Sequence, residues 1–319
     1  MNLLAIEIGG SKLQLFAGTS DGAILERRRV VIDRAAGGAG IRKQIESALP
    51  ELIAKWEPRA IGVGFGGPVD AQTGVIARSY HLEGWSGFPL AAWLTERTGL
   101  PAFIENDANT AALGESRHGA GRGENPVFYV TLGSGVGGGL VVNDRIYHGA
   151  PPGEVEIGHV RLDRDGTIVE ARCAGWSVDR RIREEVAVNP DSRLARIVRD
   201  DAPGGEARHL GAALAQGDEL ADRILTETVD WLAFGLSHVV HLLHPEIIVV
   251  GGGLSLLGEP LISRLVAALP RFLMETFLPG PRVVVAGLAE DAVPVGALSL
   301  AAEKVAASHS TVPQGTALR

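Results

Sequence analysis

The segment VFYVTLGSGVGGGLVV, residues 127–142, holds two apolar runs joined by a turn that is rich in glycine. Apolar runs of this length on either side of such a turn predict a β-hairpin. The same pattern stands at residues 3–17, LLAIEIGGSKLQLFA, where Gly9 and Gly10 begin the turn. Two glycine-rich hairpins, one near the start and one near residue 130, predict a duplicated architecture.

Strands and helices alternate along the rest of the chain. Apolar periodicity predicts helices at 41–56, 90–98 and 296–307, and short buried strands at 60–65, 102–104, 247–250 and 283–286. A further helix is expected to begin near Asn106 or Asp107 and to end before Gly119. This alternation is typical of an α/β fold, in which ligands bind at the carboxyl ends of strands.

The length suggests two domains, since single cores stop growing at roughly 250–300 residues and the chain has 319. We expect a small α/β domain made of residues 1–105 plus 296–307. A large α/β domain is expected at 106–295, followed by a polar tail at 308–319.

The composition excludes several classes of protein. The net charge is −8, and the pI is about 5.6, so nucleic acid is not an expected partner. No uninterrupted apolar stretch approaches the ~18 residues of a membrane span, and the first residues lack the basic region of a signal peptide. One cysteine, Cys173, excludes internal disulfides and a thiolate-rich zinc site. A cytoplasmic location is expected.

Three glycine clusters follow strands, where backbone N–H groups can approach an anion closely. One turn of this kind is weak evidence, but three strand ends are hard to explain as turns alone. The expected phosphate-binding residues are Gly9, Gly10, Ser11, Lys12, Gly133, Ser134, Gly135, Gly137, Gly251, Gly252 and Gly253.

Six motifs, in this order along the chain, carry a resemblance to a known family. They are IEIGGSK at 6–12, GVGFGGPVD at 62–70, ENDAN at 105–109, the glycine turn at 133–139, EIGH at 156–159 and HPEIIVVGGG at 244–253. The chain resembles the ROK family of sugar kinases and repressors over residues 6 to about 300. The resemblance implies a two-domain actin/hexokinase-like (ribonuclease H-like) fold with duplicated sheets and an interdomain cleft. It also implies ATP, Mg²⁺ and a homodimer.

The resemblance implies that Asp107 is the general base for the primary hydroxyl of a sugar. Phosphoryl transfer needs positioning, charge neutralisation and a base near the attacking hydroxyl, and Asp107 lies at a strand-to-helix junction where a carboxylate can face a cleft. The alternative is that Asp107 only caps the helix. Asn106 and Gly67 are the expected sugar contacts on the same side.

Glu156 and His159 are three residues apart and can converge on one ligand. Alone, they could also form a surface pair or half of a metal site, but the resemblance implies that they bind sugar hydroxyls. Glu170 is a further sugar ligand by the same resemblance, with a solvated loop charge as the alternative.

Three departures from the family pattern matter. Glu7 stands where the family has an aspartate that helps to hold magnesium through water, and we expect it to serve in that role. The cysteine-rich zinc loop of the family is missing, so no zinc is expected. His81 stands where an asparagine is common, and it is either a change in the sugar pocket or an ordinary loop residue.

The predicted function is ATP-dependent phosphorylation of a hexose-like sugar at its primary hydroxyl. A catalytically weak or inactive sugar- or nucleotide-binding protein remains an alternative because of Glu7. A DNA-binding regulator is not expected, because it would need a DNA-binding segment before the first hairpin, which begins at residue 3. Another actin-like ATPase is not expected either, because the pairs Asn106–Asp107 and Glu156–His159 suit a polyhydroxylated ligand. The sugar stays open among glucose, N-acetylmannosamine, fructose, mannose and allose.

Overall fold

The computed structural model describes residues 1–10, 12–79, 83–151, 153 and 155–310, so Ser11 and His81 lie outside the described residues. The chain divides into two compact units. Unit 1 comprises Met1–His118, Tyr147–Glu154 and Asp291–Arg319, and unit 2 comprises Gly119–Ile146 and Val155–Glu290.

Unit 1 is built on a five-stranded sheet in the order β3-β2-β1-β4-β7. Its strands are β1 (Asn2–Ile8), β2 (Leu13–Thr19), β3 (Ile24–Val30), β4 (Ile61–Phe65) and β7 (Ala102–Asn106). The pairs β1–β2 and β2–β3 are antiparallel, whereas β4 pairs parallel to both β1 and β7. The carboxyl ends of β1, β4 and β7 therefore meet at one edge of the sheet. A small hairpin of β5 (Val69–Asp70) and β6 (Val75–Ile76) follows β4.

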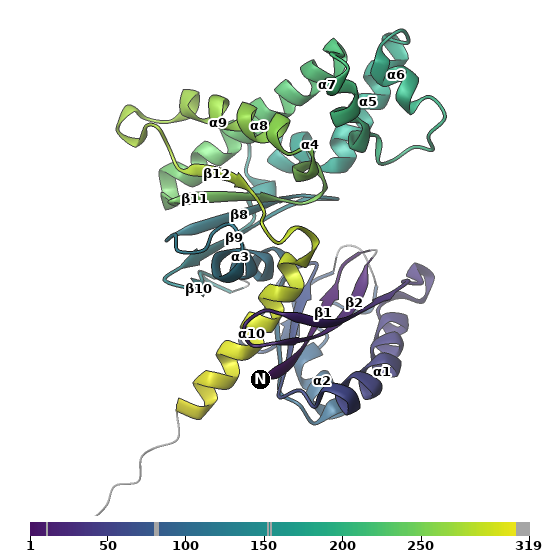
Figure 1. Ribbon diagram of the computed structural model, residues 1–319, viewed down its shortest axis with the longest axis vertical. Helices are drawn as coiled ribbons and strands as arrows, with labels where there is room; N and C mark the ends of the chain where they lie inside the picture. Colours follow the sequence, from purple (N-terminus) through teal and green to yellow (C-terminus); the bar gives the residue numbers. More distant parts are fainter. Residues whose placement is uncertain (11, 80–82, 152, 154, 311–319) are drawn as a thin grey trace, which may run out of the picture. The chain divides into compact units, whose positions relative to one another are not determined.

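Helices cover both faces of this sheet (Figure 1). On one face, α1 (Gly37–Trp56) and α2 (Leu90–Thr98) bury apolar side chains against the strands. On the other face, α10 (Ala292–Ser310) packs on β1, β2 and β4 and against α3 (Asp107–His118).

Glycines allow α3 and α10 to pack backbone to backbone. A methyl group on Gly296 of α10 would lie 1.8 Å from the carbonyl oxygen of Thr110, and one on Gly114 of α3 would lie 2.4 Å from that of Ala292. Gly62 of β4 is as tightly placed, since its methyl group would lie 1.9 Å from the carbonyl oxygen of Ala297. Only a residue without a side chain fits at these three positions.

Unit 2 repeats the same topology in the order β10-β9-β8-β11-β12. Its strands are β8 (Val127–Leu132), β9 (Val136–Val142), β10 (Arg145–Ile146), β11 (Ile247–Gly251) and β12 (Arg282–Val285). The first three strands are antiparallel, and β11 pairs parallel to both β8 and β12. Both sheets thus have the same arrangement, with three antiparallel strands followed by two parallel ones. This repetition confirms the predicted α/β class and the predicted duplication.

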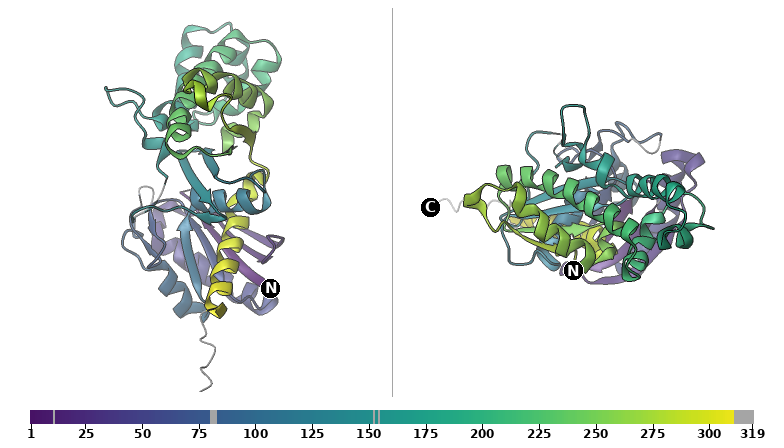
Figure 2. Two further views of the ribbon diagram at one scale, coloured as in Figure 1. Left: turned by 90° about the vertical axis from the view of Figure 1, so that its left-hand side faces the viewer. Right: turned by 90° about the horizontal axis from the view of Figure 1, so that it is seen from above.

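Helices pack on the sheet of unit 2 around a large apolar core, and Figure 2 shows them from two sides. They are α4 (Val169–Cys173), α5 (Gly175–Val188), α6 (Arg193–Val198), α7 (Leu210–Ala215), α8 (Glu219–Leu243) and α9 (Glu259–Ala268). Short 3-10 helices occur in both units. They are Arg34–Ala36, Ile157–His159, Glu206–His209, Gly253–Leu257, Leu269–Phe272, Glu275–Phe277 and Ala289–Asp291. Within the described part of the chain, none of the helices combines the length and apolar character that a membrane crossing needs.

The predicted elements are present in the structure, and several are longer than expected. The helix at 90–98 has the expected limits, whereas the last helix begins at Ala292 rather than near 296. The compact units differ from the expected domains in assigning α3 and Tyr147–Glu154 to unit 1, and α3 belongs there because it packs with α10. The domain limits themselves stay a prediction.

Candidate functional site

The ends of β1, β4 and β7 meet closely in unit 1 around Gly66. The amide of Gly66 donates to the carbonyl oxygen of Ile8 (2.8 Å). A methyl group on Gly66 would lie 3.3 Å from Asp107 Oδ2 and 3.4 Å from the Cα of Gly9. Three of the predicted motifs are thus neighbours in unit 1: the first glycine turn, the loop after β4 and the segment that carries Asp107.

Glu7, near the end of β1, is held by two partners from the first hairpin. Lys12 Nζ lies 3.1 Å from Glu7 Oε2, and Gln14 Nε2 donates to the same oxygen (3.0 Å). Gln14 is buried and accepts in turn from Arg29 Nε (3.0 Å). Gln14 is not among the predicted site residues, although its place as a polar residue inside the apolar run 13–17 could have indicated a polar partner. The carboxylate is therefore fixed beside the turn in which Gly9 N donates to Lys12 O (2.8 Å).

Asn106 caps the helix that follows β7. Its Oδ1 accepts from the amides of Ala108 (2.9 Å) and Asn109 (3.1 Å), which are the second and third residues of α3. Its Nδ2 donates to the carbonyl oxygen of Gly67 (3.3 Å). An amide nitrogen carries two hydrogens, so one contact does not exhaust the donors of Asn106. Because Asn106 supplies the cap, Asp107 is not needed for it.

Glu105 of β7 contacts His148, and the sequence did not predict this contact. The side chain of Glu105 is buried, and its Oε1 accepts from Asn106 N (2.9 Å) and Asn109 Nδ2 (3.1 Å). Its Oε2 lies 2.6 Å from His148 Nε2. Asn109 Nδ2 also donates to Gly153 O (3.2 Å). These bonds hold Asn106 and Asn109, which lie on the two sides of Asp107, and they fasten His148 and Gly153 within unit 1.

In unit 2, the second glycine turn is braced by the segment at 170–175. Gly133 N donates to Gly135 O (2.9 Å), and Gly175 N donates to Gly133 O (2.8 Å). The side chain of Glu170 contacts the far side of the turn, where Oε2 accepts from Val136 N (2.9 Å). Ser134 is exposed at the tip, and Gly137 pairs with Thr131 at the start of β9.

The third glycine cluster lies beside the second within unit 2. A methyl group on Gly251 would lie 2.2 Å from the hydroxyl of Tyr129, and one on Gly252, whose φ is +82°, would lie 2.5 Å from the backbone of Leu132. Gly253 has open space around it. The Tyr129 side chain therefore requires glycine at 251 and the Leu132 backbone requires it at 252, whereas the space beside Gly253 is open.

Glu156 directly precedes the short helix Ile157–His159 and His159 is its last residue, and both are exposed. This helix packs directly on β9, because a methyl group on Gly158 would lie 2.1 Å from Val136 O. It is also tied to Glu170, since Val169 N donates to Val160 O (3.1 Å). The predicted sugar-binding residues of unit 2 are thus neighbours of the second glycine turn.

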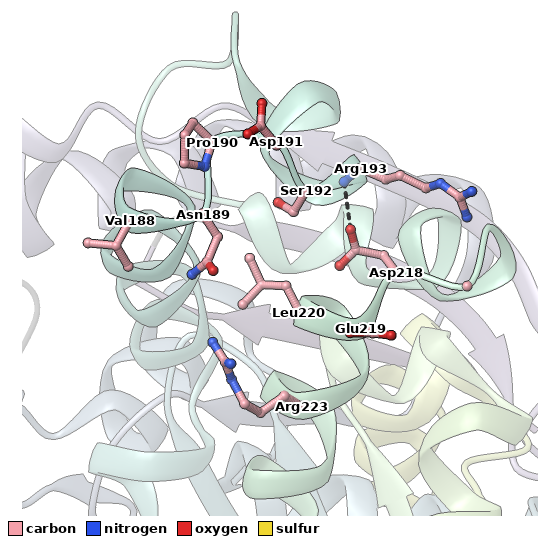
Figure 3. A pocket seen from close by; sticks show the side chains of 11 residues that line it. Val188, Asn189, Pro190, Asp191, Ser192, Arg193, Asp218, Glu219, Leu220 and Arg223 are labelled. Atoms are coloured by element: carbon pink, nitrogen blue, oxygen red, sulfur yellow. Dashed lines mark hydrogen bonds between the residues drawn. The ribbon is translucent and has the colours of Figure 1, made fainter.

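A surface hollow in the helical part of unit 2 contains none of the predicted site residues. It has a volume of about 530 Å³ and lies between residues 188–193 and 217–223. Figure 3 shows Asp218 at its wall, where one carboxylate oxygen accepts from Arg193 N (2.6 Å). The same side chain accepts from Leu194 N and Ala221 N. Asp218 therefore joins two helices, which is a structural role.

Neither a reactive thiol nor a cluster of metal ligands is found among the residues that the structure describes. Burial raises the pKa of Cys173 to about 12, so this thiol is inert at neutral pH. Within the residues that the structure describes, no group of three or more histidine, cysteine, aspartate or glutamate side chains could hold a metal ion. A single carboxylate such as Glu7 is still suited to magnesium, which keeps several waters and binds substrate phosphates.

A sequence profile of the ROK family matches residues 3–304, which is nearly the whole chain. The chain belongs to the ROK family. Among similar ROK proteins, the glucokinase of Thermotoga maritima is 30% identical over 315 residues, which cover 96% of this chain and 98% of that protein.

Solved structures of ROK kinases have the same fold. A glucokinase from Streptomyces griseus, solved in complex with glucose and AMPPNP, is 29% identical and superposes with a TM-score of 0.83 over 95% of this chain and 100% of that one. A hexokinase from Thermus thermophilus is 28% identical, with a TM-score of 0.79 over 96% of this chain and 100% of that one. The predicted resemblance and the actin/hexokinase-like fold are thereby confirmed.

Proposed function

We propose that this ROK protein transfers the γ-phosphoryl group of ATP to the primary hydroxyl of a hexose-like sugar, with Asp107 as general base. The class of enzyme, an ATP-dependent sugar kinase, follows from the family match and from the glucokinase relatives. The observation that carries the role of Asp107 is that Asn106 caps α3. Asp107 lies instead near Gly66 and the first glycine turn.

In the proposed reaction, the sugar oxygen attacks the γ-phosphorus while the bond from that phosphorus to the β–γ bridging oxygen breaks. The hydroxyl proton passes to the carboxylate of Asp107. ADP leaves, and the sugar phosphate is released with it. Backbone amides at the predicted phosphate-binding glycine turns would hold the phosphates, since transfer of this kind depends mainly on positioning and charge neutralisation. Glu105 would keep the backbone of Asn106 and Asp107 in place through its bond from Asn106 N.

Mg²⁺ is part of this proposal, with Glu7 as an indirect ligand through water. The ion supplies neutralisation of phosphate charge when it is bound with ATP. Lys12 and Gln14 hold the Glu7 carboxylate beside the first turn. No other carboxylate is required from the protein, because the phosphates provide the remaining charge.

On the acceptor side, we propose that Gly67, Asn106, Glu156, His159 and Glu170 contact the sugar. Glucose is the first substrate to test, because the Thermotoga relative is a glucokinase and the Streptomyces structure holds glucose. A homodimer and a cytoplasmic location belong to the same proposal. A weak or inactive binding protein is the second candidate, because Lys12 and Gln14 already engage the Glu7 carboxylate.

The test is Asp107→Asn, assayed with ADP detection over a panel of hexoses. We expect kcat to fall by about 10²–10⁴-fold, while binding of Mg–AMPPNP stays within the error of wild type. Asp21→Asn is the matched control, since Asp21 is an exposed carboxylate of unit 1 outside all of the motifs. Retention of near-full kcat by Asp107→Asn would exclude the proposed role.

A further inference from the structure

A carboxylate occupies the second glycine turn, where the proposed function places phosphate. Glu170 Oε2 accepts from Val136 N at 2.9 Å. The same oxygen lies 2.8 Å from the position that a methyl group on Gly135 would take. The negative charge of Glu170 is therefore in contact with the turn itself.

This placement opposes nucleotide binding. Backbone N–H groups at a glycine-rich turn attract anions, and Val136 N already has an anionic partner. A polyphosphate that approaches the turn meets a like charge within a few ångströms, and such repulsion costs free energy that solvent screens only in part. The arrangement suits a turn that is closed to ATP until Glu170 finds another partner.

The segment that carries Glu170 is bonded to the segment of unit 2 that carries the proposed sugar-binding residues Glu156 and His159. Glu170 directly follows Val169, and the amide of Val169 donates to Val160 O (3.1 Å). Val160 follows His159, and a bridge between Arg161 and Ile168 ties the same two segments. One short segment therefore connects the phosphate turn to the residues proposed to bind sugar.

Val136 is the junction of these contacts. Its amide donates to Glu170, and its carbonyl oxygen lies against Gly158 of the short helix Ile157–His159. A shift of the Glu170 side chain toward a sugar hydroxyl would free Val136 N without a change in the backbone.

We infer that Glu170 makes ATP binding depend on sugar binding: its carboxylate blocks the second glycine turn until a sugar hydroxyl draws it away from Val136 N. This inference rests on the proposed function and deepens it. Bound sugar and bound nucleotide then favour each other, and linkage requires the effect to be reciprocal.

The experiment measures the Kd of Mg–AMPPNP by calorimetry, without sugar and with the sugar that turns over best. In wild type, we expect saturating sugar to tighten nucleotide binding by about 5–150-fold, the usual range of coupling between sites. Glu170→Gln keeps the length and an acceptor oxygen but removes the charge. It should bind nucleotide several-fold more tightly than wild type without sugar, and its coupling factor should fall close to one.

Two controls keep the outcomes apart. Glu184→Gln removes the same charge from the exposed face of α5, and its affinity should equal that of wild type. Glu170→Ala, which also removes the hydrogen bond, should tighten sugar-free binding like Glu170→Gln, and thermal unfolding checks that both variants fold.

Unchanged or weaker sugar-free binding in the folded Glu170 variants would overturn the inference while leaving the kinase proposal intact. Absence of nucleotide binding in wild type, with or without sugar, would overturn the kinase proposal itself.

Discussion

Replacing Gly296 by alanine should damage both the stability of unit 1 and the position of Asp107. The new methyl group would lie 1.8 Å from the carbonyl oxygen of Thr110 in α3 and 3.1 Å from the amide nitrogen of Gly114. The first of these atoms belongs to a backbone that cannot rotate away. The helices must therefore separate by more than an ångström before this contact becomes an ordinary one.

The magnitude follows from two opposing effects. Alanine improves helix propensity over glycine by up to about 1 kcal/mol. Overpacking a well-packed interior costs about 1–3 kcal/mol, and a clash between backbones places Gly296→Ala at the upper end. The net loss is roughly 1–2 kcal/mol, which lowers Tm by about 2–8 °C for a protein of this size class. Because α3 carries Asp107, a displacement of about 1 Å can also lower kcat by up to about 10²-fold.

The assay pairs thermal unfolding with kcat at a temperature where both proteins are folded. Gly211→Ala in α7 is the matched control, because its methyl group would meet only Leu257 Cδ2 at an ordinary 3.5 Å. The control should be as stable as wild type or slightly more stable. If Gly296→Ala equals Gly211→Ala in both Tm and kcat, the close packing of α3 and α10 does not constrain the site and the reasoning is refuted.

Three further predictions concern metal and pH. Glu7→Asp should keep its Mg²⁺-dependent kcat and Glu7→Gln should lose most of it, whereas activity in Glu7→Asp but not in wild type would mark the natural protein as a degenerate kinase. Bonds from Lys55, Trp56 and Arg28 lower the pKa of Glu26 to about 2, so the ionised form stabilises the fold above the ordinary pKa of 4.5 and this contribution is lost as the pH falls toward 2. The free energy of unfolding in urea should consequently drop less between pH 7 and pH 3 in Glu26→Gln than in wild type, and an equal drop would contradict the assignment. Elemental analysis of protein purified without added metal should find no stoichiometric zinc, and a chelator should leave Tm unchanged; zinc lost together with sugar affinity would show that ligands were missed.

Sequence patterns predicted the parts of the fold that depend on local apolar periodicity. Both glycine-rich hairpins and the helix at 90–98 follow from spacing alone. The strand Ile24–Val30 was missed because its sequence, ILERRRV, shows little apolar character. It forms because β2 offers a free edge and because its charged side chains find partners, such as Glu26 with Lys55.

The candidate site was predictable in its motifs but not in its contacts. Spacing could not decide whether Asn106 or Asp107 caps α3, since either side chain suits the position, and the two hydrogen bonds that Asn106 Oδ1 accepts assign the cap to Asn106. The contacts of Glu105 with His148 and of Glu170 with Val136 join residues far apart in the chain. Such pairs depend on tertiary packing, and a single sequence carries no signal for them. The roles of the site residues stay predictions.

The discontinuity of unit 1 sets an order of events during protein synthesis. One face of its sheet, with Leu3, Phe16 and Ala60, is buried under Ala297 and Leu298 of α10. A growing chain emerges from the ribosome at about 5–20 residues per second, so the whole of unit 2 is synthesised before the helix that covers these first strands. Unit 2 spans Gly119–Ile146 and Val155–Glu290, and its core can close while α10 is still unmade. The amino-terminal strands, made first, are thus the last to be covered, and during this interval their apolar face is exposed to misfolding and to chaperones.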